Sequence, residues 1–194
     1  LTVPEEYGGS GKDMMATIAI IEELASRSLG IASGFIFCAC YAGLNISEAA
    51  SEAQKQELLP MVAKGKMLFS YGISEPDVGA DVASVRTKAV IDGDEVIING
   101  TKRWCSGPNV TDFIYTIVRS GPEEDRYRNL SLILIPPKAK GITIEVQQTL
   151  GQKGVGGTCD VTFEDVRVPI ENIVGGLDGW NNGWNKIVST GLDV

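Results

Sequence analysis

The segment Tyr71-Gly72-Ile73-Ser74-Glu75-Pro76-Asp77-Val78-Gly79-Ala80-Asp81 decides how the rest of the chain is interpreted. It follows an apolar run directly, yet it cannot continue as a smooth strand. Pro76 lacks a backbone donor, and Gly79 permits backbone conformations that other residues avoid, so we predict a loop. A loop with exposed N–H groups and small side chains can hold a flat or anionic ligand, or it can be an ordinary surface turn.

The residues before this loop predict helices. Apolar residues recur at helical spacing after Asp13, a predicted N-cap, and Gly30 is the predicted end of that helix. A second helix is predicted over 32–46; because it is apolar almost all round, we expect it to be buried or to line a pocket. A third helix, over 51–63, is expected to start at the cap Ser51 and to bury Leu58, Leu59, Met61 and Val62.

The residues after Lys66 predict strands. Asp92-Gly93-Asp94 is a hairpin signal, and the other breaks also carry turn residues. Short strands are predicted at 67–73, 85–91, 95–99, 113–119, 130–135, 142–146 and 160–163. A last helix is expected around Trp184, after the strands end. The fold class is therefore α+β: a helical domain (1–66), an antiparallel β-barrel-like domain (67–175) and the start of a C-terminal helical bundle (176–194).

Composition excludes several classes of function. The net charge of −8 and the absence of a Lys/Arg cluster argue against a nucleic-acid surface. Histidine is absent, so neither a Ser-His-Asp triad nor a histidine base is present in these 194 residues. The four cysteines have no metal-site spacing, and we expect free thiols and no metal. No secretory leader is visible, and we expect no apolar run to reach the ~20 residues of a transmembrane segment.

A second stretch, Ile98-Asn99-Gly100-Thr101-Lys102-Arg103-Trp104-Cys105-Ser106, completes a pattern. Together with Pro4 to Gly9, the loop 71–81 and Phe163 to Pro169, it resembles the acyl-CoA dehydrogenase family over nearly the whole chain. In that family, the loop corresponds to the first flavin signature and 98–106 to a strand with a flavin-contacting turn. The resemblance implies that the chain holds the N-terminal and middle domains, with the C-terminal bundle truncated.

The resemblance also implies an activity. It is the α,β-dehydrogenation of an acyl-CoA thioester in fatty acid or amino acid catabolism, with hydride transfer to N5 of FAD. The expected partners are an acyl-CoA substrate, an electron-transfer flavoprotein and further copies of the chain, as a homotetramer or a dimer. The expected location is the bacterial cytoplasm or the mitochondrial matrix. The alternatives are an acyl-CoA oxidase or flavin monooxygenase of the same fold, or a non-catalytic binding domain.

Individual site residues follow from the same resemblance. Short hydroxyls and backbone groups suit the polar edge of a flavin. The residues expected to bind FAD are Tyr71, Ile73, Ser74, Gly79, Ala80, Trp104, Cys105 and Ser106, and those expected to contact substrate are Ala80 and Asp193. Ser74 would lie near N1 and O2, Trp104 on the ring, and Ser106 near N5. Bulky Phe35, Phe37 and Tyr41 are expected beside a short, branched or aromatic acyl chain.

One residue of the loop departs from the common family pattern. Ala80 stands where many members have serine, so one hydroxyl contact to FAD or CoA is missing. The catalytic base is expected beyond Val194, so none is assigned in this chain. Glu75, Asp77 and Asp81 are the carboxylates of the loop, and we predict that they are structural.

Overall fold

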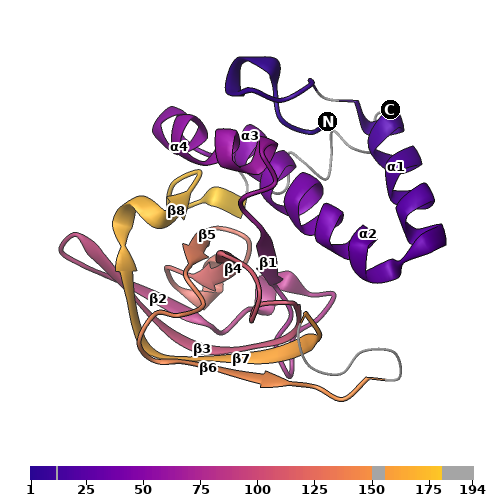
Figure 1. The fold of residues 1–194 in the computed structure, drawn as a ribbon. Coiled ribbons are helices and arrows are strands. Elements are labelled where there is room, and N and C mark those ends of the chain that lie inside the picture. Colours follow the sequence, from indigo (N-terminus) through magenta and orange to yellow (C-terminus); the bar gives the residue numbers. More distant parts are fainter. Residues whose placement is uncertain (12, 150–155, 181–194) are drawn as a thin grey trace. The chain divides into compact units, whose positions relative to one another are not determined.

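A computed structural model describes residues 1–11, 13–149 and 156–180. By its internal contacts the chain divides into two compact units, Leu1–Phe69 and Ser70–Val194. The first unit is helical, and the described part of the second is built on a β-sheet (Figure 1). The predicted α+β class, with helices before strands, is confirmed. The helix expected around Trp184 lies outside the described residues.

Side-chain caps set the helix boundaries of the first unit. Its elements are η1 (Glu5–Tyr7), α1 (Met14–Arg27), α2 (Leu29–Ile36), the π-helical η2 (Phe37–Leu44), α3 (Asn45–Ala49) and α4 (Glu52–Ala63). Asp13 caps α1 by accepting a 2.8 Å hydrogen bond from the Ala16 N–H, as predicted. Ser51 and Gln54 form a reciprocal capping box at α4.

Two details of the helix predictions are wrong. Gly30 does not end the first helix, because Ser28 ends α1 and its side chain also caps α2, which places Gly30 within a new first turn. Met61 is 38% exposed, whereas Leu58, Leu59 and Val62 are buried as expected. The apolar side of α4 is therefore narrower than its sequence indicates.

The helical stretch Leu29–Ala49, formed by α2, η2 and α3, is 21 residues long with a mean hydropathy of 1.7 in its most apolar part. By length and composition it is long enough to cross a membrane, so the expectation that no apolar run reaches that length is wrong. One such helix is weak evidence for a span, since a core helix passes the same test. Ala32, Phe37, Ala42 and Ile46 are buried, but only 39% of the most apolar part of the stretch is buried.

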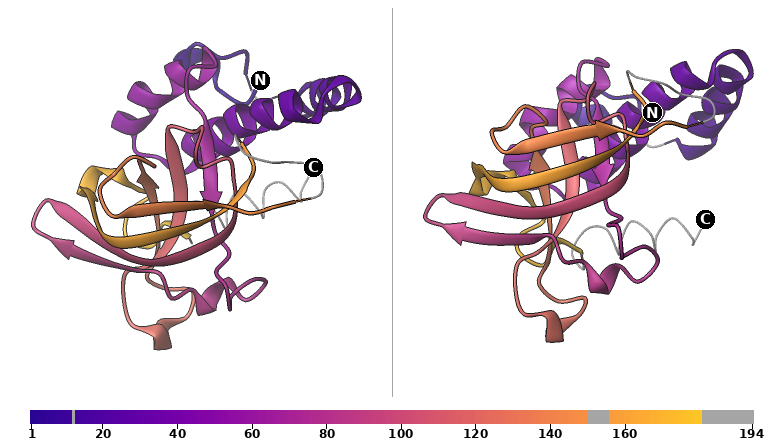
Figure 2. Two further views of the ribbon diagram at one scale, coloured as in Figure 1. Left: turned by 60° about the horizontal axis from the view of Figure 1, so that its bottom comes forward. Right: turned by 90° about the horizontal axis from the view of Figure 1, so that it is seen from below.

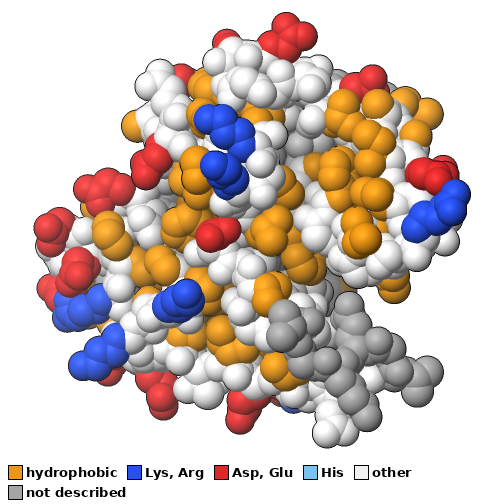
Figure 3. All heavy atoms as spheres, viewed as in Figure 1, with side chains coloured by type: hydrophobic (Ala, Val, Ile, Leu, Met, Phe, Trp, Pro, Cys, Tyr) orange, Lys and Arg blue, Asp and Glu red, His pale blue; other side chains and the backbone are white. Residues whose placement is uncertain are grey.

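The helical unit also carries exposed apolar side chains. Figure 3 shows them gathered over α1 and α2. They include Met14, Met15, Ile18, Leu29 and Ile31, of which Met15 is 77% exposed and Leu29 is 70% exposed. A face of this composition is typical of a surface that packs against other protein.

The second unit is organised by a strongly curved eight-stranded sheet (Figure 2). Its order is β6-β7-β3-β2-β4-β5-β8, and β1 pairs with β4. The strands are β1 (Phe69–Gly72), β2 (Lys88–Asp92), β3 (Glu95–Ser106), β4 (Phe113–Arg119), β5 (Leu130–Ile135), β6 (Ile142–Val146), β7 (Thr158–Pro169) and β8 (Ile173–Val174). β2 and β3, β3 and β7, β4 and β5, β5 and β8, and β6 and β7 pair antiparallel. β2 and β4 meet in a parallel bridge, in which Lys88 pairs with Arg119.

The hairpin predicted at Asp92-Gly93-Asp94 is present: Asp92 pairs with Glu95, and Gly93 has a φ of +67°. The next strand is longer than predicted. β3 continues to Ser106 instead of ending at Asn99, because β7 pairs with it along nearly its whole length. The interior between the strands is filled mainly by aliphatic side chains, including Val96, Ile98 and Val161.

Candidate functional site

The carboxylate of Glu75 is the centre of a buried polar network. Its Oε1 accepts hydrogen bonds from the Thr87 N–H at 2.9 Å, from Thr87 Oγ1 at 2.7 Å and from Lys102 Nζ at 2.9 Å. Its Oε2 accepts the Arg86 N–H at 2.8 Å. The loop after β1, the residues just before β2 and the middle of β3 are therefore joined at one carboxylate, as a structural role for Glu75 requires.

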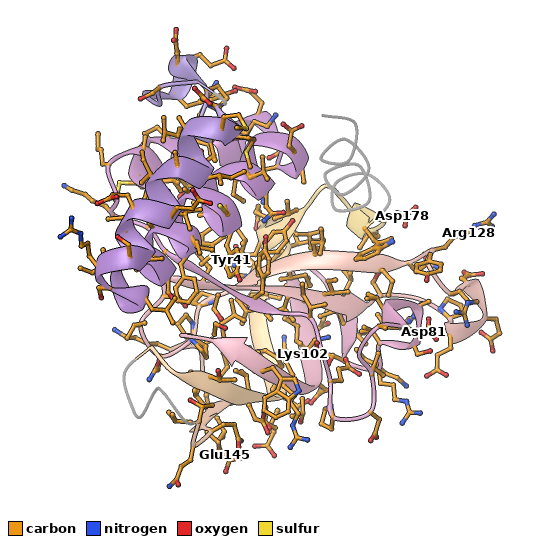
Figure 4. All side chains as sticks on the ribbon, turned by 90° about the vertical axis from the view of Figure 1, so that its right-hand side faces the viewer. Tyr41, Asp81, Lys102, Arg128, Glu145 and Asp178 are labelled. Carbon is orange, nitrogen blue, oxygen red and sulfur yellow. The ribbon has the colours of Figure 1, made fainter. Side chains whose placement is uncertain are left out.

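Lys102 completes this network from β3. Its ammonium donates to the Ile73 carbonyl at 3.1 Å as well as to Glu75, and its side chain is fully buried. Figure 4 shows it among the strands, in contrast to the peripheral Glu145 and Arg128. A buried charge is tolerated only when it is paired and hydrogen-bonded. The pairing with Glu75 and the bond to Ile73 therefore hold the backbone just before Ser74.

The two charges shift each other's titration. Burial raises the pKa of Glu75, but the Lys102 charge and the hydrogen bonds from Thr87, Lys102 and Arg86 outweigh it, so the pKa lies below its usual value. Burial lowers the pKa of Lys102, and Glu75 opposes that change only in part. Glu75 is thus held as a carboxylate and is a poor proton acceptor near neutral pH.

A backbone hydrogen bond joins the two stretches that the sequence singles out. The Arg103 N–H donates to the Ser74 carbonyl at 2.8 Å, so the loop after β1 lies against β3. Tyr71, in β1 just before the loop, packs its ring against Tyr115 with centroids 5.8 Å apart. Tyr71, Ile73 and Ser74 are each half-buried. The hydrogen bond to Arg103 therefore holds the Ser74 backbone beside the Trp104 segment.

Trp104 lies in a β-bulge. Lys102 pairs with Val161 and Cys105 with Cys159, so Arg103 and Trp104 together face the single residue Asp160 on β7. Trp104 has a φ of +62°, which is a genuine outlier for a bulky side chain, and it is 58% exposed. The segment predicted as a turn is thus a bulged strand. Strain and exposure at one aromatic residue are features typical of a ligand site.

Arg103 stabilises the bulge through its side chain. Its Nε and Nη2 both lie 3.2 Å from Asp160 Oδ2, and its guanidinium carbon lies 5.3 Å from the centre of the Trp104 ring. Asp160 is nearly buried, and among the described residues its Oδ1 has no hydrogen-bond partner. Asp160 Oδ2 therefore pairs with Arg103, whereas Oδ1 accepts no hydrogen bond from the described residues.

The other predicted site residues differ in how far they are exposed. Ser106 is half-buried at the end of β3, where it pairs with Thr158. Cys105 is fully buried, so its side chain is closed to a ligand contact, and burial raises the pKa of its thiol to about 12. Gly79 and Ala80 are exposed in the loop. Asp193 lies outside the described residues.

The prediction that Gly79 is needed for a backbone conformation that other residues avoid is wrong. Its φ is not positive, and an added Cβ would meet no heavy atom within 4 Å, so its backbone conformation does not demand glycine. A position near the site where the fold does need glycine is Gly100, which has a φ of +147° and whose Cβ would lie 2.6 Å from Thr87 Oγ1. Gly100 lets Thr87 approach β3 and reach Glu75.

The other two loop carboxylates are also ion-paired, and both are exposed. Asp81 lies 3.0 Å from Arg126, and Asp77 lies 3.8 Å from Arg86. Neither is near a group of metal ligands, since the described residues contain no cluster of three or more His, Cys, Asp or Glu that could hold a metal ion. These contacts agree with the structural role predicted for both residues.

The aromatic residues expected beside an acyl chain belong to the helical unit. Phe35 borders a cavity of about 300 Å³ with Cys38, Ala39 and Val62. Phe37 instead stacks on Tyr41, with ring centroids 5.5 Å apart. Only one of the three aromatic residues therefore borders this cavity.

Sequence reasoning missed Lys102, Arg103 and Asp160 as members of the site. Lys102 had a usable signal, because a lysine in the interior of a β-rich run needs a buried carboxylate partner. Arg103 and Asp160 had none, since they are 57 residues apart and meet only through the register of β3 and β7.

Comparison with known proteins agrees with this architecture. The family model described as acyl-CoA dehydrogenase, N-terminal domain, matches residues 1–66, and that of the middle domain matches residues 70–166. Acyl-CoA dehydrogenase FadE26 of Mycobacterium tuberculosis is 34% identical over 193 residues, which cover 98% of this chain and 46% of the relative.

Solved structures have the same fold. A glutaryl-coenzyme A dehydrogenase in complex with glutaryl-CoA superimposes with a TM-score of 0.82 at 30% identity, over 96% of this chain and 46% of that one. An acyl-CoA dehydrogenase from Bacillus anthracis complexed with FAD gives 0.79 at 26% identity, over 97% and 32%. The chain spans about half the length of the curated relatives it matches. It belongs to the acyl-CoA dehydrogenase family and contains that family's N-terminal and middle domains.

Proposed function

We propose that the protein of which this chain forms part is an FAD-dependent acyl-CoA dehydrogenase that removes hydrogens from the α and β carbons of an acyl-CoA thioester. The observation that carries the proposal is the hydrogen bond from the Arg103 N–H to the Ser74 carbonyl, at 2.8 Å. It brings the half-buried Ser74 edge next to the exposed, strained Trp104. A planar ring with a polar edge fits such a corner.

The described residues fit a flavin in chemical character. Tyr71, Ile73, Ser74 and Ser106 supply backbone groups and hydroxyls for the polar edge, and Trp104 supplies an aromatic surface for the ring. Cys105 is fully buried, so we do not assign it a direct flavin contact. Gly79 and Ala80, exposed and without large side chains, suit the pyrophosphate or the pantetheine arm. The bound FAD supplies the chemistry of hydride acceptance, while these residues bind and orient it.

The α-proton requires a base, and no loop carboxylate is suited to that role. Glu75 is held ionised by Lys102 and three further hydrogen bonds, while Asp77 and Asp81 pair with arginines. We therefore assign the base to a carboxylate beyond Val194, and the CoA contact of Asp193 stays a prediction. The short, branched or aromatic acyl group expected from Phe35, Phe37 and Tyr41 stays a prediction.

The proposal also includes an electron acceptor, an assembly and a cellular location. The electron acceptor is an electron-transfer flavoprotein, the assembly is a homotetramer or dimer, and the location is the bacterial cytoplasm or the mitochondrial matrix. The exposed apolar face of α1 and α2 supports an assembly, because such a face is typical of packing surfaces.

Absorption spectroscopy of the purified full-length protein tests the proposal. We expect flavin bands that bleach when acyl-CoAs are added anaerobically and return only slowly in air. Rapid reoxidation by oxygen would point to an oxidase or monooxygenase instead. A protein that shows no flavin bands and retains no added FAD would be a non-catalytic binding domain, and the proposal would fail.

A further inference from the structure

The bulge in β3 places two side chains together that a regular strand would keep apart. Successive residues of a strand point to opposite faces of the sheet. At Arg103 and Trp104 that alternation fails, because the two residues face only Asp160 and Trp104 takes a φ of +62°. The guanidinium carbon of Arg103 consequently lies over the Trp104 ring, 5.3 Å from its centre.

Asp160 fixes the arginine in this position. Both Nε and Nη2 of Arg103 lie 3.2 Å from Asp160 Oδ2, and the Asp160 side chain is only 12% exposed. The Arg103 backbone is held separately, by the hydrogen bond from its N–H to the Ser74 carbonyl at 2.8 Å. Arg103 thus links the loop after β1, the bulge in β3 and the strand β7.

We propose that Arg103, anchored by Asp160, is a positioning residue for the cofactor: it clamps one face of the Trp104 ring and leaves the other face for the flavin. The inference rests on the proposed function, because it takes the ligand to be FAD. A positive φ held at an exposed tryptophan has a conformational cost, and the clamp offsets part of it. Without the clamp, the ring adopts several orientations, and binding must select one of them.

The contacts also explain why the clamp needs arginine. A guanidinium is planar, so it can stack on an indole while its edge pairs with a carboxylate; an ammonium cannot do both. Lysine at position 103 would keep the charge and lose the planar contact. Asparagine at position 160 would keep the size of the side chain and lose the charge that holds the arginine.

The first test needs no flavin. The full-length apoprotein is labelled with 5-fluorotryptophan, and its ¹⁹F resonances are recorded; the resonance missing from Trp104→Phe belongs to Trp104. We expect Arg103→Gln and Asp160→Asn to shift and narrow that resonance, because the ring is released. Arg103→Lys should give an intermediate shift. Arg167→Gln, which removes an exposed arginine paired with Asp92 and Glu95, should leave it unchanged.

The second test measures the dissociation constant of FAD for the same variants after reconstitution. We expect Arg103→Gln to weaken FAD binding about 3- to 30-fold, as for loss of a cation–π contact, with Arg103→Lys in between and Arg167→Gln unchanged. Far-UV circular dichroism confirms that each variant is folded. If Arg103→Gln does not fold, Arg103→Lys and Asp160→Asn decide the question.

The outcomes separate the two proposals. A wild-type protein that binds no FAD refutes the proposed function, and the clamp as a cofactor device with it, whatever the ¹⁹F spectra show. FAD binding with an unmoved Trp104 resonance in both Arg103→Gln and Asp160→Asn overturns the clamp alone. A moved resonance with unchanged FAD affinity also overturns it, because the ring position would then not matter for the cofactor. A moved resonance with weakened FAD binding supports both.

Discussion

Two ion pairs start from neighbouring residues of β3 and differ in almost every respect. Lys102 and Glu75 are at most 5% exposed, and Glu75 accepts four hydrogen bonds. Arg103 is 38% exposed, and its partner Asp160 has one oxygen without a hydrogen-bond partner among the described residues. The first pair ties backbone segments together. The second lies beside a strained, exposed tryptophan.

The difference teaches how a structural pair can be told from a functional one. A buried pair must be fully hydrogen-bonded because each unsatisfied group costs free energy. Backbone strain at an exposed aromatic residue, as at Trp104, is instead typical of a ligand site. Substitutions at the two pairs should therefore affect different quantities: stability at Glu75–Lys102, and ligand binding at Arg103–Asp160.

The largest effect is expected from Glu75→Gln, which leaves the Lys102 ammonium buried without its counter-charge. We expect it to lower the free energy of unfolding of the full-length protein by about 3–5 kcal/mol in urea denaturation. Glu145→Gln, at an exposed position on β6, is the matched control and should change little. Adding Lys102→Met to Glu75→Gln should restore part of the loss; a double variant as unstable as the single one would show that the charge is not the cause.

Comparing Trp104→Gly with Trp104→Ala should separate the backbone strain at this position from the role of the ring in binding. Glycine adopts a φ of +62° without strain, so the free energy of unfolding should rise by about 1 kcal/mol relative to Trp104→Ala, which keeps a Cβ. FAD retention should fall in both variants, measured by flavin absorbance after gel filtration. Equal stability of the two variants would contradict the assigned backbone strain, and full FAD retention would remove Trp104 from the site.

The free energy of unfolding at acidic pH should depend on Glu75. Its pKa is lower in the folded protein than in the unfolded chain, so its contribution is complete above the unfolded value of about 4.3 and is lost as the pH falls through the folded value. The free energy of unfolding should fall less steeply below that pH in Glu75→Gln than in the unmodified protein. Parallel curves would mean that the carboxyl titrates alike in both states.

The smallest effect is expected at the exposed end of the loop. Ala80→Ser should leave the free energy of unfolding within about 0.5 kcal/mol, because Ala80 is exposed. If the loop faces FAD or CoA as proposed, the added hydroxyl should tighten binding of one of them about 2- to 10-fold, as for one hydrogen bond, by isothermal titration calorimetry. Unchanged affinity for both ligands would exclude position 80 from the contact surface.

The sequence by itself determined the local elements and the family. Caps such as Asp13 and Ser51, the Gly93 hairpin and the β-rich runs of β4, β5 and β6 depend on neighbouring residues, so their signals are present in short windows. The motifs around Ser74 and Trp104 carried the resemblance that the family models bear out.

Only the tertiary structure decided how these motifs meet. The network around Glu75 spans 27 residues to Lys102, and the clamp spans 57 residues from Arg103 to Asp160. Both depend on strand register, and the bulge that turns Arg103 toward Trp104 exists because β3 has one residue more than β7 between their paired positions. A register is set by the packing of the whole sheet, so no single stretch of sequence contains it.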